Sequence, residues 1–123
     1  MWIVKECTLL SFCMIKCIEN DDGTIVSIGR TAKGNDLLWK SSEKHHIWLH
    51  LQNESSPHVV IHNNESHFED KVLLKQAALF VKQYSKLRNE KKVKVIYCKI
   101  DNLYPTKTLG MVKLKNTPNC ISV

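Results

Sequence analysis

The chain has 123 residues, 43% of them hydrophobic and 24% charged, so it is neither too small nor too polar to bury the core of one domain. Its net charge of +6 is unevenly distributed. Residues 1–70 carry six basic and ten acidic side chains, whereas residues 71–123 carry twelve basic and two acidic ones.

The basic second half predicts a polyanionic partner, with nucleic acid as the leading candidate. A lysine-rich solvated surface is the alternative interpretation. Sixteen of the basic residues are lysines, and the two arginines are Arg30 and Arg88. Because a guanidinium can grip a phosphate with two hydrogen bonds, these two positions are the most informative.

The first seventeen residues are apolar but interrupted by charges, and they predict buried strands. Their longest uncharged run, Cys7–Ile15, is too short to cross a membrane. The chain has five cysteines and no C-x-x-C pattern, which favours free thiols in a reducing compartment over a disulfide framework. We therefore expect a cytoplasmic protein with no membrane partner.

A hairpin and a short helix are expected next. Strands over Cys13–Ile18 and Thr24–Ile28 flank a turn that contains Asp-Gly, a favoured hairpin dipeptide. Thr31–Gly34 is expected to be a loop. Asn35 can cap a short helix over Asp36–Ser42, because its side chain accepts a bond from a free backbone N–H.

A central hairpin follows, with strands Ile47–Leu51 and His58–His62 joined by the polar loop Gln52–Pro57. Side chains alternate faces along a strand, so placing His50 opposite His58 separates two surfaces. One is aliphatic, with Ile47, Leu49, Leu51, Val59 and Ile61. The other carries His46, Trp48, His50, His58, Val60 and His62. Either this second face is a functional surface, or Trp48 and Val60 pack under a helix and the histidines lie at the edge of that layer.

A long helix is predicted from the capping-box spacing of Ser66 and Glu69 to about Arg88. An apolar stripe at helical spacing supports it, formed by Leu73, Ala77, Phe80, Tyr84 and Leu87. Basic side chains crowd its end, at Lys86, Arg88, Lys91 and Lys92. These four either contact a polyanion or complement the helix dipole.

The remaining chain predicts strands at Val93–Lys99, Met111–Leu114 and Cys120–Val123, with a loop or edge over Asp101–Thr108. The fold class is therefore α+β, a largely antiparallel sheet with one long and one short helix, in a single domain over residues 1–123.

Known catalytic motifs are absent from the sequence: there is no G-x-S-x-G, no P-loop and no H-E-x-x-H. Histidines four apart on a strand are about 13 Å apart, so at most His50 and His58 could share a zinc ion, and other ligands would be needed. We therefore expect no metal, no cofactor and no enzyme activity.

An ordered set of motifs over residues 22–123 resembles the RNA-binding domain of the NFACT family, the fibronectin-binding-protein-A-like factors of ribosome-associated quality control. The matching pieces include Gly29-Arg30, Asn35-Asp36, Ile47-Trp48-x-His50, Ser56-x-His58-Val59-Val60-Ile61, Ala77-Ala78, Tyr84-Ser85-Lys86-x-Arg88 and Lys107-x-x-Gly110-x-Val112. The sequence departs from the pattern at His46, usually an acid, and at Ser56-Pro57, usually Gly-Ser. The N-terminal domain and coiled coil of the full-length factors are absent, so the chain resembles a stand-alone form.

The resemblance implies a non-enzymatic RNA-binding protein, acting on tRNA or rRNA and linked to translation, ribosome-associated quality control or RNA processing. The ribosome is a further expected partner. The expected RNA-contacting residues are Arg30, Lys33, Asn35, Trp48, His50, Ser56, His58, Lys86, Arg88 and Lys107. His50 and His58 are expected to be partly charged near pH 6. Alternatives are a DNA-binding or protein-docking adaptor that uses the same basic face, and a histidine-dependent metal hydrolase.

Overall fold

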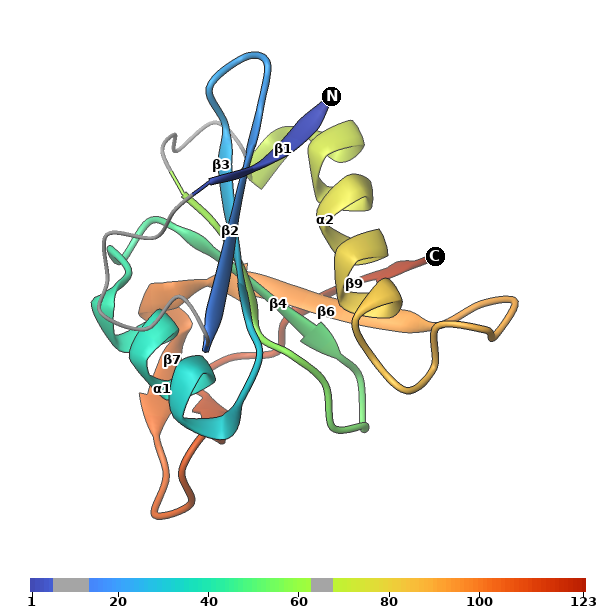
Figure 1. Cartoon of the computed structure of the whole chain (residues 1–123). Coiled ribbons are helices and arrows are strands. Elements are labelled where there is room, and N and C mark those ends of the chain that lie inside the picture. The colour runs from blue at the N-terminus through green and yellow to red at the C-terminus, as the bar shows by residue number, and fades with distance from the viewer. Residues whose placement is uncertain (6–13, 63–67) are drawn as a thin grey trace.

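The computed structural model describes residues 1–5, 14–62 and 68–123 (Figure 1). The elements in these ranges are β1 (Trp2–Lys5), β2 (Ile15–Asn20), β3 (Ile25–Gly29), α1 (Ala32–Ser41), β4 (Ile47–Leu51), β5 (Val59–Ile61), α2 (Lys71–Gln83), β6 (Lys94–Lys99), the 3-10 helix η2 (Ile100–Asn102), β7 (Leu103–Pro105), β8 (Val112–Leu114) and β9 (Asn119–Ser122). The predicted α+β class is confirmed.

Seven strands form one antiparallel sheet in the order β1-β2-β3-β5-β4-β6-β9, and β7 pairs with β8 in a separate ribbon. The β4–β5 hairpin lies at the middle of the large sheet. Trp48 is opposite Val60, and Leu49 is opposite Val59. Continued by one residue, this register places His50 opposite His58, as the hydrophobic pattern predicts.

The two faces of the central hairpin contact different helices. The aliphatic face packs against α2, whose Ala77 and Ala78 are fully buried and allow a close approach to the sheet. The opposite face contributes Trp48 and Val60 to a second cluster, which includes Leu38 of α1. Of the two interpretations of this face, packing under a helix is therefore correct for Trp48 and Val60.

Helix α1 begins one turn earlier than predicted. Its N-cap is Thr31, whose side-chain oxygen accepts a hydrogen bond from the backbone N–H of Gly34 at 2.9 Å. Asn35 therefore lies inside the helix and does not cap it. Position 34 requires glycine, because a Cβ there would collide with the backbone carbonyl of Met14. Threonine and asparagine are both good N-caps, so local preference alone did not distinguish the two starts.

Helix α2 is shorter than predicted at its C-terminal end. Asp70 caps its start by accepting a hydrogen bond from the N–H of Leu73 at 3.0 Å, whereas Ser66 lies outside the described residues. The helix ends at Gln83 and not near Arg88. The hydroxyl of Ser85 donates to the carbonyl of Lys82 at 2.8 Å, which satisfies a C-terminal carbonyl and turns the chain away.

The N-terminal strand β1 pairs with β2 at the edge of the sheet. Its Ile3 and Val4 are 54% and 68% exposed, so the expectation of a buried strand is wrong here, and residues 6–13 lie outside the described part. Cys17 is disulfide-bonded, which contradicts the expectation of a free thiol at that position, whereas Cys98 and Cys120 are free. Among the described residues, no helix is long and apolar enough to cross a membrane.

Candidate nucleic-acid interface

A pocket of about 1120 Å³ opens beside the central hairpin, and we call it the central pocket. Its walls come from the end of β3, the first turn of α1, the β4–β5 loop, the segment after α2 and the β7–β8 loop. Seven of the ten residues expected from the sequence line it, namely Arg30, Asn35, Trp48, His50, Ser56, His58 and Lys86. Residues as far apart in the chain as Ile28 and Leu114 thus border one pocket.

Asn35 joins the α1 wall of the central pocket to the hairpin. Its side-chain oxygen accepts a hydrogen bond from the backbone N–H of His58 at 3.1 Å, while the N–H of Gly29 donates to the carbonyl of His58 at 2.8 Å. A Cβ at Gly29 would overlap the Asn35 side chain, so only glycine permits this approach. The exposed Arg30, next in the chain, is thereby held at the pocket rim.

An aromatic stack forms the pocket floor. Trp48 is only 2% exposed, and its ring lies parallel to that of His50, with centroids 5.4 Å apart and planes 12° apart. His58 meets both rings edge-on. Because the indole is covered, Trp48 does not offer its own face for base stacking. Of these three lining rings, the half-buried imidazole of His50 is the most exposed.

The floor histidines are neutral at physiological pH. Burial, aided by the neighbouring His50, lowers the pKa of His58 to about 3, although the backbone of Gly110 and the charge of Asp36 act in the opposite direction. Burial also lowers the pKa of His50, despite the hydrogen bond between its Nδ1 and the carbonyl of Leu51 at 2.7 Å. The expectation that His58 becomes partly charged near pH 6 is therefore wrong, and the lowered pKa of His50 also disfavours a charge on that ring.

Two buried polar atoms of the floor lack hydrogen-bond partners within the described ranges, Nδ1 of His58 and Nε1 of Trp48. Buried polar groups are normally satisfied, because an unmet hydrogen bond costs about 1–3 kcal/mol. An indole N–H can only donate, whereas a neutral imidazole nitrogen donates or accepts according to its tautomer. The floor thus combines aromatic surface with unused hydrogen-bonding capacity.

The pocket rim carries the charges. Arg30 and Lys86 are both exposed, and Lys86 forms an ion pair with Glu54 at 3.1 Å. The first turn of α1, all of it described, contains no acidic side chain, so the positive end of the helix dipole faces the pocket uncompensated at that turn. Asp36, in the following turn, pairs with Lys40 at 2.7 Å.

Three expected residues do not line the central pocket: Lys33, Arg88 and Lys107. All three are exposed. Lys33 follows the lining residue Ala32, and Lys107 lies in the β7–β8 loop near the lining residue Gly110. Arg88 lies in the turn after α2, because that helix ends five residues earlier than predicted.

Sequence reasoning missed part of the pocket wall. Glu54 lines it and pairs with Lys86, and the exposed Leu109 and Met111 form an apolar side. The signal for this side is Gly110, which has φ +80° and presses against Ala32, where a Cβ would collide. That contact brings the β7–β8 loop over the N-terminus of α1.

The histidine pair that the sequence allows to share an ion, His50 with His58, gains no third ligand from the described residues. Their rings are 5.3 Å apart, but within the described ranges no other histidine, cysteine or carboxylate joins them in a cation-binding group. The sole acid that lines the central pocket among the described residues is Glu54, already paired with Lys86. Among its described lining residues, the pocket therefore has neither a metal-ligand set nor a carboxylate pair for acid–base chemistry.

Comparisons with known proteins relate the chain to a protein family and to solved structures. The family model of the NFACT protein RNA binding domain matches residues 12–115. A solved structure, the C-terminal part of the fibronectin/fibrinogen-binding protein from Streptococcus suis, is 25% identical, with a TM-score of 0.78. The match covers 87% of this chain and 44% of the other, so the chain spans less than half of that structure. No curated protein matches the sequence.

Proposed function

Since the chain belongs to the family of the NFACT protein RNA binding domain, we propose that it binds RNA through the central pocket. The observation that carries the proposal is the convergence of seven expected contact residues on one pocket of about 1120 Å³. Cationic side chains at the rim suit phosphates, and the aromatic and apolar interior suits bases. This division of roles is typical of proteins that bind unpaired nucleotides.

The pocket favours a base that is not held in a duplex. A flipped-out or loop base can stack on the imidazole of His50, which Trp48 supports from below. Leu109 and Met111 provide an apolar side for that base. Its flanking phosphates would then lie near Arg30 and Lys86.

The finer identity of the RNA rests on the family. We propose a structured RNA with exposed loop bases, tRNA or rRNA, and a role linked to translation, ribosome-associated quality control or RNA processing, with the ribosome as a further partner. A non-enzymatic role is supported by the single, ion-paired acid found among the described lining residues. We also propose a cytoplasmic location, which fits the free Cys98 and Cys120 but not the disulfide-bonded Cys17.

A competition experiment tests this function. Labelled tRNA is bound to the protein and displaced by unlabelled tRNA, single-stranded RNA or duplex DNA of equal length. We expect the two RNAs to compete and the duplex DNA to compete poorly. Equal competition by duplex DNA would support the DNA-binding alternative and contradict the pocket-binding mode, because paired bases cannot enter the pocket.

Crosslinking locates the contact. RNA carrying a photoreactive uridine is irradiated with the protein, and the modified peptides are identified by mass spectrometry. We expect crosslinks in the peptides that contain His50 and Met111. Lys75 provides a control, because it is exposed on the first half of α2 and does not line the pocket. Crosslinks confined to α2 would move the RNA site away from the central pocket.

A further inference from the structure

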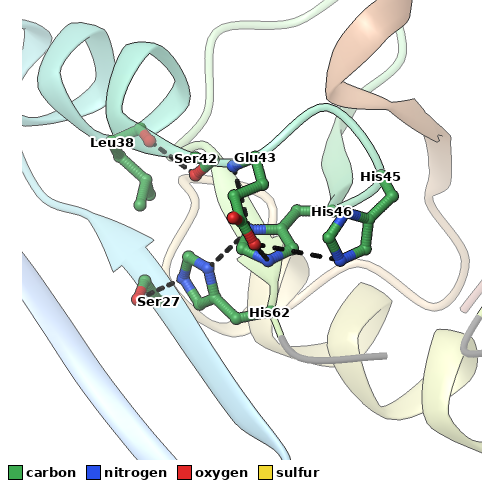
Figure 2. A network of polar contacts seen from close by, with 7 residues as sticks. All are labelled: Ser27, Leu38, Ser42, Glu43, His45, His46 and His62. Carbon is green, nitrogen blue, oxygen red and sulfur yellow. Dashed lines mark hydrogen bonds and ion pairs between the residues drawn. The ribbon is translucent and has the colours of Figure 1, made fainter. Parts of the chain in front are cut away.

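A second histidine cluster lies at the other end of the β4–β5 hairpin (Figure 2). It consists of Glu43, His45 and His46 in the turn between α1 and β4, with His62 behind them just after β5. One ligand atom from each of Glu43, His45 and His46 lies within 4.8 Å of the others. His46 is about 13 Å along the strand from His50, so the cluster is separate from the central pocket.

The spacing of the ligand atoms suits a small divalent transition-metal ion. Oε2 of Glu43 is 3.4 Å from Nε2 of His46 and 4.0 Å from Nε2 of His45. In a tetrahedral zinc site with bonds of about 2.0–2.1 Å, neighbouring ligand atoms are roughly 3.3 Å apart. The Glu43–His46 pair already has this separation. The side chain of Glu43 is 72% exposed and free to rotate, so the longer distance, from Glu43 to His45, can shorten without moving the backbone.

The backbone that presents these ligands is fixed by the fold. The N–H of His46 donates to the carbonyl of Glu43 at 3.0 Å and closes a turn. The hydroxyl of Ser42 donates to the carbonyl of Leu38 at 2.7 Å, which attaches this turn to the end of α1. Figure 2 shows the two imidazoles and the carboxylate pointing toward one another from this turn.

A chain of hydrogen bonds supports His46 from behind. Its Nδ1 is 3.1 Å from Nδ1 of His62, whose Nε2 is 2.8 Å from the hydroxyl of Ser27. Metal-binding histidines usually donate their other ring N–H to such a partner, which orients the ring. If His46 donates to His62 and His62 donates to Ser27, Nε2 of His46 keeps a lone pair that faces Glu43.

The same atoms permit a second arrangement without metal. The backbone N–H of Glu43 lies 3.2 Å from Nδ1 of His46 and can donate to it. In that tautomer the proton is on Nε2, which then donates to the carboxylate of Glu43. A cation at Nε2 selects the first arrangement, because a metal-bound nitrogen cannot also carry a proton.

We propose that Glu43, His45 and His46 bind one divalent transition-metal ion of the zinc type, with His62 orienting His46. Imidazole and carboxylate together suit zinc and its neighbours better than magnesium or calcium, which prefer oxygen ligands. Three protein ligands leave the fourth position of a tetrahedral ion to water. The proposal does not depend on RNA binding and assigns no catalytic role to the ion.

Metal titration of the tag-free full chain tests the site. Zn²⁺ is added in competition with a chromogenic chelator, and we expect the parent to bind one equivalent. Glu43→Gln and His45→Ala should each abolish this stoichiometric binding, and circular dichroism should show them folded because both side chains are on the surface. His50→Ala is the matched control, since it removes an imidazole outside the cluster, and it should bind zinc as the parent does.

Co²⁺ identifies the ligand types independently. We expect visible d–d absorption without the near-ultraviolet charge-transfer band that a thiolate ligand produces. A thiolate band would assign the metal to a cysteine and overturn the proposal. It would also be overturned by a parent that binds no stoichiometric zinc, or by Glu43→Gln and His45→Ala variants that bind zinc with unchanged affinity.

Discussion

The side-chain oxygen of Asn35 accepts a hydrogen bond from the backbone N–H of His58 at 3.1 Å, which links the first half of α1 to the start of β5. Removing this acceptor leaves a partly buried N–H without a partner. We therefore expect Asn35→Ala to lower the free energy of unfolding by about 1–3 kcal/mol. Urea denaturation followed by circular dichroism measures the change. Asn35→Asp, which retains an acceptor oxygen, should recover part of the loss; an Asn35→Ala variant as stable as the parent would show that the bond contributes nothing.

Arg30 and Arg88 form a matched pair, because both are exposed but only Arg30 lines the central pocket. We expect Arg30→Ala to weaken RNA binding by about 1–3 kcal/mol, the range of a hydrogen bond to a charged group. It should also reduce the slope of the logarithm of the association constant against the logarithm of the salt concentration, by the amount expected for about one phosphate contact. Arg88→Ala should have a smaller effect. Fluorescence anisotropy at several salt concentrations measures both, and a larger loss for Arg88→Ala would place the phosphate contacts elsewhere.

Glu54 opposes RNA binding in two ways, since it occupies Lys86 at 3.1 Å and places a negative charge at the pocket rim. Both side chains are substantially exposed, and such pairs contribute about 0–1 kcal/mol. We therefore expect Glu54→Gln to tighten RNA binding by up to about fivefold. Asp101→Asn removes the same charge from an exposed position outside the pocket and should change the affinity less. Equal effects of the two variants would indicate general repulsion only.

His50 presents the aromatic surface at the pocket floor. We expect His50→Ala to weaken RNA binding by about 1–3 kcal/mol, the range for loss of one base–aromatic stack. Because burial lowers the pKa of His50, this loss should not grow toward pH 6. His50→Phe should retain most of the affinity, because it keeps a stacking ring. A loss that grows toward pH 6 would mean that a charged imidazole contacts phosphate.

Acid should destabilise the fold through its buried histidines. Burial lowers the folded-state pKa of His58 to about 3 and that of His62 to about 4. The neighbouring His50 also lowers the pKa of His58, and His46 does the same for His62. The unfolded state, with pKa near 6.5, therefore binds more protons as pH falls below 6.5. Above that pH these histidines do not reduce the free energy of unfolding. Below it, the free energy of unfolding should decrease by up to about 1.4 kcal/mol per pH unit for each histidine, until the pH reaches its folded-state pKa.

Urea denaturation at pH 7, 6 and 5 measures this dependence. His58→Gln removes one of the two buried histidines. The free energy of unfolding of this variant should therefore decrease less steeply between pH 7 and pH 5, even if the variant is less stable at pH 7. A parent whose stability is constant from pH 7 to pH 5 would contradict the buried, neutral state of these histidines.

The sequence by itself determined the central hairpin and its register. One pairing of Ile47–Leu51 with His58–His62 keeps Ile47, Leu49, Leu51, Val59 and Ile61 on one face, and a slip by one residue would mix the two faces. The excess of positive charge after residue 70 and the ordered family motifs are also properties of the sequence alone. The motifs led to the family and to seven of the residues that line the central pocket.

Tertiary structure decided which of those residues are accessible and where the helices begin and end. Thr31 and Asn35 are comparable caps, and the choice between them depends on the contact of Gly34 with Met14, distant in sequence. Once α1 covers the hairpin, Trp48 becomes floor and His50 becomes surface. The pairing of His46 with His62 follows from the same register, but the turn that adds Glu43 and His45 depends on how α1 ends. Local pattern cannot fix such relationships, because they arise from contacts between segments far apart in the chain.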